Sequence, residues 1–202
     1  VFPAESVLVA DGGNTAVWAM MFTQSRVPNT ILSTFKMGML GAGVAQATGA
    51  AVARPEHPVC CIIGDGAMGF HPQEVETAVR NGLRVIWLVL CDKQWGMVKM
   101  NQQFMLKPIK TLIRKSLGPD ETIKADLGEI RFDDLGRSMG AHGERVADPR
   151  ELTAAIERAI ALLAQQATRQ RAGDAAGRKD DLGKGAQWHW ATFGHRPRSG
   201  HA

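Results

Sequence analysis

The sequence lacks any long hydrophobic run and contains few cysteines. No apolar run approaches the roughly 18 residues of a membrane-spanning helix, and no signal-peptide pattern opens the chain, so we expect neither a membrane span nor export. The three cysteines, Cys60, Cys61 and Cys91, match no metal-ligand spacing. They lie in or at the end of apolar runs, where a buried thiol is the ordinary interpretation, and their odd number favours a reducing, cytoplasmic compartment.

An excess of one charge sign is also absent from most of the chain. The formal net charge is +4, yet the first 165 residues contain 17 basic and 17 acidic side chains. The surplus lies in residues 166–202, which hold seven Lys or Arg against three Asp and few aliphatic residues. We therefore predict a folded domain over residues 1–165 and a disordered basic tail over 166–202 that the core does not need. Nucleic-acid binding by this tail is the less favoured alternative.

What remains is the composition of one globular domain. Of the 202 residues, 45% are hydrophobic and 22% are charged, enough to bury a core. The first residue is Val1 and not methionine, and the opening stretch resembles a linker that enters a strand. We therefore expect further sequence upstream.

Short apolar runs alternate with helical patterns. The runs predict strands at residues 6–10, 29–34, 58–64, 84–90 and 143–147. The helical patterns lie at residues 15–22, 41–53, 72–82, 132–140 and 148–166. This alternation predicts a doubly wound α/β fold, a parallel sheet with helices on both faces. Residues 99–128 contain several turn formers and predict a long excursion over the carboxyl ends of the strands, where such folds bind ligands.

The stretch IIGDGAMGFHP, residues 62–72, allows two interpretations. Its three glycines fit the G-x-G-x-x-G pattern of dinucleotide-binding folds, and Asp92 ends the next strand, where a ribose-binding acid would lie. Against this, a helix that began in the glycine loop would contain Pro72, and a proline inside a helix destabilises it by about 3 kcal/mol. Asp65 would also repel a bare pyrophosphate, unless a divalent cation lay between them.

A site for magnesium and a diphosphate accounts for both acids. Asp65 and Asp92 follow neighbouring strands, so their carboxylates can bracket one Mg²⁺ ion, and backbone N–H groups of residues 64–69 can hold the phosphates. The alternative is that the two aspartates only cap or end secondary-structure elements. His71, beside the loop, is either a proton carrier or a helix cap.

At these residues the sequence resembles a known family. The stretch GDGAMGFHPQEVETAVRNGLRVIWLVLCDKQWGM resembles the pyrophosphate-binding domain of thiamine diphosphate-dependent enzymes of the acetolactate synthase, pyruvate decarboxylase and benzoylformate decarboxylase type. The signature of that family is Gly-Asp-Gly followed, after a spacer, by Asn-Asn. The resemblance extends from about residue 6 to residue 163 and implies thiamine diphosphate and Mg²⁺ as cofactors.

The resemblance implies a role for individual residues. Asp65, Asp92 and the backbone carbonyl of Gln94 match the metal ligands of the family. Leu40 matches an apolar wedge that keeps the two cofactor rings in a V, although without the resemblance it would be interpreted as core packing. The other implied cofactor contacts are Gly13, Asn14, Thr15, Gly38, Met39, Gly64, Gly66, Ala67, Gly96 and Met97.

Three departures from the family qualify this interpretation. Cys91-Asp92 replaces Asn-Asn, the tail replaces the usual last strand, and the pyrimidine-binding domain with its activating glutamate is absent. The implied function is the cofactor-binding domain of a 2-oxo acid decarboxylase or carboligase, a lyase or transferase. It would need a separate or missing pyrimidine-binding domain in a homo- or hetero-oligomer. The alternatives are an NAD or flavin nucleotide-binding module, and a regulatory subunit that has lost turnover.

Overall fold

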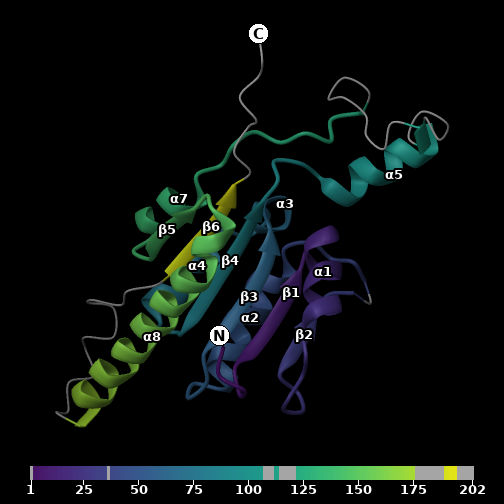
Figure 1. Cartoon of the computed structure of the whole chain (residues 1–202). Coiled ribbons are helices and arrows are strands. Elements are labelled where there is room, and N and C mark those ends of the chain that lie inside the picture. The colour runs from purple at the N-terminus through teal and green to yellow at the C-terminus, as the bar shows by residue number, and fades with distance from the viewer. Residues whose placement is uncertain (1, 36, 107–111, 114–121, 176–188, 195–202) are drawn as a thin grey trace.

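A parallel sheet forms the centre of the molecule (Figure 1). The computed structural model describes residues 2–35, 37–106, 112–113, 122–175 and 189–194. The strands are β1 (Val7–Asp11), β2 (Ile31–Ser33), β3 (Val59–Gly64), β4 (Val85–Cys91), β5 (His142–Val146) and β6 (His189–Gly194). Their order in the sheet is β2-β1-β3-β4-β6-β5, and every neighbouring pair is parallel.

Helices lie on both faces of this sheet. They are α1 (Asn14–Phe22), α2 (Ala42–Ala53), α3 (Asp65–Met68), α4 (Glu74–Arg80), α5 (Gly96–Leu106), α7 (Phe132–Ser138), the 3₁₀ turn η2 (Pro149–Glu151) and α8 (Leu152–Ala175). In Figure 1, α1 and α8 lie on the side toward the viewer, and α2 lies behind the sheet and packs against α4. This arrangement confirms the doubly wound α/β prediction. In the described parts of the chain, no helix is long and apolar enough to cross a membrane.

The core lies along the two central strands. Val59, Cys61 and Ile63 of β3 are buried, as are Trp87 and Val89 of β4. Both strands have neighbours on each side and helices on each face, which explains why their sequences are nearly continuous apolar runs. The predicted strands at these positions and at 6–10, 29–34 and 143–147 are confirmed, with ends shifted by one to two residues.

The chain around Pro72 follows the prediction in part. Helix α4 begins at Glu74, so Pro72 lies before the helix, where its missing N–H costs nothing. The glycine loop, however, is not entirely irregular, because α3 forms one short turn of helix directly after β3. Helix α3 thus ends at Met68, before Pro72, so neither α3 nor α4 contains the proline.

The carboxyl-terminal region differs from the prediction. Residues 189–194 form β6, which pairs with β4 on one side and β5 on the other, so the expectation that the tail replaces the last strand is wrong. Helix α8 also continues through residue 165 to Ala175. The HWATFG sequence gave no strand signal in isolation because pairing with two distant strands decides its conformation. The prediction of disorder for the rest of the tail falls on residues 176–188 and 195–202, outside the described residues.

Helix α5 was also not predicted. It opens the expected excursion after β4, and Figure 1 shows it extending away from the sheet. None of its residues is buried, so the core provides little of the packing that would reveal a helical pattern. Much of the rest of the excursion, 107–111 and 114–121, lies outside the described residues.

Candidate functional site

A pocket of about 290 Å³ lies beyond the carboxyl ends of β1, β3 and β4. Doubly wound sheets bind their ligands at this edge, and the volume is near the lower end of small-molecule sites. The turns that follow four parallel strands form most of its wall, and the start of α5 forms the remainder. The lining residues are Gly12, Gly13, Asn14, Thr15, Thr34, Phe35, Gly38, Leu40, Gly64, Asp65, Gly66, Ala67, Asp92, Gln94, Trp95, Gly96, Met97, Val98 and Asn101.

The pocket brings together the residues that the resemblance implies, with one exception. All of them except Met39 line it. Met39 is 60% exposed, because in the turn after Gly38 (φ 60°) its side chain faces solvent while Leu40 faces inward. Leu40 lines the pocket and also packs against the hydrophobic core, so both interpretations of this residue describe its position.

Asp65 is the buried acid of this pocket, with 6% of its surface exposed. Its Oδ1 accepts a hydrogen bond from the N–H of Gly66, and its Oδ2 accepts one from the N–H of Lys93, both at 2.8 Å. Burial raises the pKa of Asp65; the two hydrogen bonds oppose this, repulsion from Asp92 adds to it, and the net direction is upward. The carboxylate therefore lacks compensating positive charge, which a bound cation would supply.

Asp92 lies closer to solvent and is held by Gln94. Oδ1 of Asp92 accepts a hydrogen bond from the Gln94 N–H at 3.3 Å, and Oδ2 accepts one from Nε2 at 3.1 Å. A Cβ on Gly96 would lie 3.1 Å from Oδ2 of Asp92 and 3.0 Å from Nδ2 of Asn14. The carboxylate and the amide thus flank the same glycine.

Glycines let the walls of the pocket approach one another. A Cβ on Gly66 would lie 2.6 Å from the ring of Trp95, and a Cβ on Gly13 would lie 2.7 Å from the Cβ of Met97. Gly12 adopts a φ of 104°, in the left-handed region that favours glycine. No larger residue fits at positions 13 and 66 without moving α5 or the turn before it.

Asp11 was missed by the sequence analysis although it organises the pocket wall. It is fully buried at the end of β1 and does not line the pocket. Its Oδ1 accepts hydrogen bonds from the Gly12 N–H at 2.6 Å and the Thr34 hydroxyl at 3.4 Å, and its Oδ2 accepts one from the Gly43 N–H at 2.8 Å. One carboxylate therefore joins the turns after β1 and β2 to the start of α2. The sequence does contain a signal for this role, since Asp11 ends an apolar run and directly precedes Gly12 and Gly13.

Trp95 is the second residue that the sequence analysis did not select. Its ring covers Gly66 and makes an edge contact with Phe70, with ring centroids 5.8 Å apart. Its position between Gln94 and Gly96, both implied by the resemblance, could have identified it. His71 is not among the lining residues, and its backbone carbonyl accepts a hydrogen bond from the Glu74 N–H at 3.2 Å. Its contribution to the start of α4 comes from this carbonyl.

The charge and donor set of the pocket fit a divalent cation. Asp65 and Asp92 are the only charged residues among the described residues that line it, so an anionic ligand would meet two carboxylates and no side-chain cation. The described residues contain no cluster of three His, Cys, Asp or Glu side chains for a metal. Two carboxylates with a backbone carbonyl of Gln94 form a smaller set of oxygens, which suits Mg²⁺ because this ion keeps water and phosphate ligands.

Comparison with known proteins identifies the type of domain to which this chain belongs. Residues 11–168 match the family described as thiamine pyrophosphate enzyme, C-terminal TPP binding domain. An acetolactate synthase large subunit of Mycobacterium tuberculosis is 33% identical over 158 residues, which cover 78% of this chain and 26% of that protein. The 2-hydroxyacyl-CoA lyase 2 of Caenorhabditis elegans is 31% identical over 144 residues, covering 71% of this chain and 20% of that protein.

A solved structure shows the same fold. The thiamine diphosphate-dependent 4-hydroxybenzoylformate decarboxylase of Rhodococcus jostii RHA1 aligns with a TM-score of 0.67 and 18% identity, over 98% of this chain and 31% of that one. The chain thus spans about a fifth to a third of the length of these proteins. The extent of the family match settles the assignment: the chain belongs to the thiamine pyrophosphate enzymes and corresponds to their C-terminal cofactor-binding domain.

Proposed function

We propose that the pocket binds thiamine diphosphate through Mg²⁺ and that the chain is the cofactor-binding part of a 2-oxo acid decarboxylase or carboligase, a lyase or transferase. One observation carries this proposal. A pocket of a thiamine pyrophosphate family domain has two acids and, among the described residues, no basic side chain in its wall. A diphosphate can bind there only if a cation neutralises these carboxylates.

Each part of the pocket has a task in this proposal. Asp65, Asp92 and the carbonyl of Gln94 hold Mg²⁺, and the turn at Gly66 and Ala67 receives the diphosphate. Leu40 and the apolar side chain of Met97 support the rings and keep water away from them. When bound, thiamine diphosphate supplies the nucleophilic carbon and the electron sink that cleavage or formation of a C–C bond next to a carbonyl requires.

The proposal includes a pyrimidine-binding domain that supplies the activating glutamate. The only carboxylates among the described lining residues are the two assigned to the metal, and Glu74 and Glu76 lie on α4 outside the lining. The activating glutamate must then come from another domain or subunit, in a homo- or hetero-oligomer. Large apolar side chains support such a contact: Trp18, Met21 and Phe22 of α1 and Phe104 and Met105 of α5 are more than half exposed.

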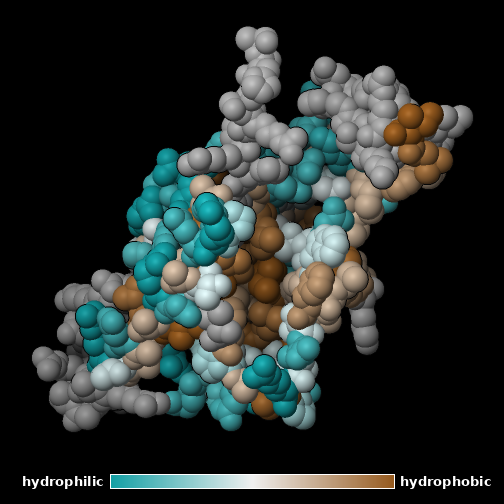
Figure 2. Space-filling model, viewed as in Figure 1, coloured by the Kyte–Doolittle hydropathy of each residue, from teal (hydrophilic) through white to brown (hydrophobic). Residues whose placement is uncertain are grey.

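The exposed apolar surface extends beyond these two helices. Figure 2 shows an apolar strip down the middle of the molecule, between α8 and α1. It also shows apolar side chains toward the end of the extension that carries α5.

Free thiols at Cys60, Cys61 and Cys91 support the proposed reducing, cytoplasmic setting.

Two other functions compete with this one. A nucleotide-binding module is disfavoured because Asp65 faces the space that a bare pyrophosphate would occupy. A regulatory subunit without turnover is favoured by Asp92, which stands where the family has a neutral amide. The presence of β6 removes one of the departures from the family that would favour such a subunit.

Calorimetry on the full chain tests the proposal. Thiamine diphosphate should bind in the presence of Mg²⁺ and not in excess chelator, and NAD should bind in neither condition. The Asp65→Ala variant should lose this binding and keep its thermal transition. Equal affinity for thiamine diphosphate with and without chelator, or NAD binding at this pocket, would refute the proposal.

A second experiment separates an enzyme from a regulatory subunit. The full chain is assayed for exchange of the cofactor C2 proton and for decarboxylation of a panel of 2-oxo acids, with and without an added pyrimidine-binding domain. Activity that appears only on addition supports half of a working enzyme. Cofactor binding without activity in any combination would favour the regulatory subunit.

A further inference from the structure

A short segment lies alongside the turn that carries the proposed metal ligands. The N–H of Trp95 donates to the carbonyl of Ala125 at 2.8 Å, and the N–H of Leu127 donates to the carbonyl of Lys93 at 2.7 Å. Gln94 and Asp126 form an antiparallel bridge between these two hydrogen bonds. Residues 125–129, which we call the strap, therefore hold the turn after β4 through backbone hydrogen bonds.

Lys93 occupies an unusual position in this turn. It adopts a φ of 59°, in the left-handed region that a residue with a side chain rarely enters. In this conformation its N–H donates to Oδ2 of Asp65 at 2.8 Å. Such a backbone conformation persists only where surrounding contacts determine it. The direction of the Asp65 carboxylate therefore depends on whatever keeps Lys93 in place.

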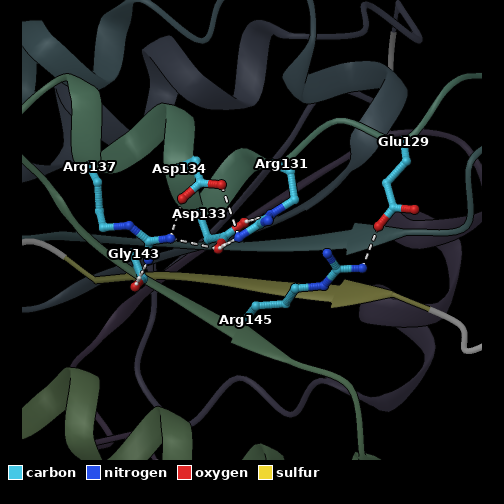
Figure 3. A network of polar contacts seen from close by, with 7 residues as sticks. All are labelled: Glu129, Arg131, Asp133, Asp134, Arg137, Gly143 and Arg145. Carbon is cyan, nitrogen blue, oxygen red and sulfur yellow. Dashed lines mark hydrogen bonds and ion pairs between the residues drawn. The ribbon is translucent and has the colours of Figure 1, made fainter.

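The side chain of Lys93 is held by the end of the strap. Nζ of Lys93 lies 2.7 Å from Oε2 of Glu129, and the other carboxylate oxygen of Glu129 pairs with Arg145 of β5 (Figure 3). The hydrogen bond from Lys93 and that from Arg145 lower the pKa of Glu129. One carboxylate thus links the turn after β4 to a strand at the far edge of the sheet.

This link lies directly behind Asp65. A small cavity of about 10 Å³, roughly the space of one water molecule, is lined by Asp65, Lys93, Glu129 and Arg145, together with Cys91, Ile130 and Asp133. Asp65 lines the large pocket on one side and this cavity on the other. Movement of Glu129 would therefore reach Asp65 both through Lys93 and across the cavity.

We infer that Glu129 is a positioning residue for the metal site: it holds Lys93 in the left-handed conformation whose N–H fixes the Asp65 carboxylate for the cation. The inference rests on the proposed function. Glu129 does not line the pocket, so it acts on the site through Lys93 and across the small cavity behind Asp65. Residues that orient metal ligands from behind typically change metal affinity by about 10–100-fold when they are lost. Because Glu129 acts one residue further away, we expect a loss of about tenfold at the lower end of this range.

The test measures metal affinity directly. Mn²⁺ is titrated into the full chain with saturating thiamine diphosphate, and its binding is followed by electron paramagnetic resonance. Glu129→Gln should weaken Mn²⁺ binding about tenfold, while its thermal midpoint stays within a few degrees of the parent because all three side chains are partly exposed. Glu129→Asp, which keeps the charge, should restore most of the affinity.

A matched variant controls for the loss of any surface ion pair. Glu144 of β5 pairs with Arg158 of α8, is less exposed than Glu129 (24% against 43% for the side chains) and is not part of either cavity. Glu144→Gln should leave Mn²⁺ affinity unchanged. Equal affinities for Glu129→Gln and the parent, or equal losses for Glu129→Gln and Glu144→Gln, would overturn the inference and leave the proposed function standing. A parent chain that binds no metal with the cofactor would overturn the proposed function, and this inference with it.

Discussion

Oδ2 of Asp11 accepts a 2.8 Å hydrogen bond from the backbone N–H of Gly43, although 32 positions separate the two residues. The contact is so close that a Cβ on Gly43 would lie 2.4 Å from the Cβ of Asp11. It joins the end of β1 to the first turn of α2, and both lie beside the pocket. The same carboxylate also accepts from Gly12, so its removal leaves two N–H groups at this buried site without an acceptor.

Asp11→Ala should destabilise the fold by about 2–4 kcal/mol, because buried donors without partners are costly. Denaturant unfolding of the full chain measures this change. Glu157→Ala, at an exposed position of α8, is the control and should change the free energy of unfolding by less than about 0.5 kcal/mol. A loss for Asp11→Ala as small as the control would show that water satisfies these N–H groups.

Gly66→Ala should abolish thiamine diphosphate binding. The added Cβ would lie 2.6 Å from the ring of Trp95, so that the ring or the turn must move into the pocket. Gly49→Ala is a matched control, since Gly49 is an exposed helical glycine with nothing within 4 Å of its Cβ position. It should keep full binding and gain about 0.5–1 kcal/mol of stability. Calorimetry and thermal unfolding check both, and unchanged binding by Gly66→Ala would contradict the expectation.

Asp92→Asn should bind thiamine diphosphate and Mg²⁺ at least as well as the parent. The substitution removes a negative charge that repels both Asp65 and the diphosphate, and the amide oxygen can still accept from Gln94. Such a like charge costs about 2–4 kcal/mol at several ångströms and an effective dielectric near 20. Glu157→Gln, which removes an exposed negative charge of α8 outside the pocket lining, is the control. A tenfold or greater loss for Asp92→Asn would identify the aspartate as a tuned metal ligand.

The buried carboxylate of Asp133 should make stability depend on pH. Burial alone would raise the pKa of Asp133, but hydrogen bonds from Arg131 and Arg137 outweigh it and lower the pKa (Figure 3). A lowered pKa in the folded state adds stability above the unfolded pKa, and this stability is lost as the pH falls through the folded pKa.

Unfolding of Asp133→Asn measures this contribution. The variant should be less stable than the parent by about 1–3 kcal/mol near neutral pH, and the gap should narrow toward about pH 3. Asp134→Asn, half exposed beside the same arginines, should show a smaller gap. A gap that is constant with pH would show that the difference comes from packing.

Truncation tests whether the fold needs β6. A chain that ends after residue 175 loses β6 and leaves β4 and β5 without a shared neighbour, so its thermal midpoint should fall by roughly 10 °C or its cooperative transition should disappear. A chain that ends after residue 194 keeps β6 and should retain the parent transition. Equal midpoints for the parent and the shorter chain would show that the fold does not need residues 176–202.

The centre of this fold and much of the pocket could be predicted from the sequence, because local patterns determine them. Runs such as 58–64 and 84–90 are apolar because both faces of their strands are buried, and polar residues directly after them must lie at the carboxyl edge. Asp65 and Asp92 could be placed by this argument alone. The doubly wound order followed from the alternation of strands and helices.

The parts that could not be predicted depend on distant contacts. β6 has its position because β4 and β5 pair with it across long stretches of chain, and α5 has no buried residue that would mark its face. Glu129 acts on Lys93 from 36 positions away. Met39 and Leu40 are adjacent apolar residues, and only the turn at Gly38 decides which of them faces inward.

The place of β6 has a consequence for how the protein is made. Among the described strands, β5 pairs with β6 alone, and β6 is the last of them to be synthesised. Until residues 189–194 have left the exit tunnel, nascent chains present the open edge of β4, whose end carries Asp92. We therefore expect β5 to join the sheet only after residues 189–194 have emerged, and chains stalled before residue 189 to expose the open edge of β4 to aggregation.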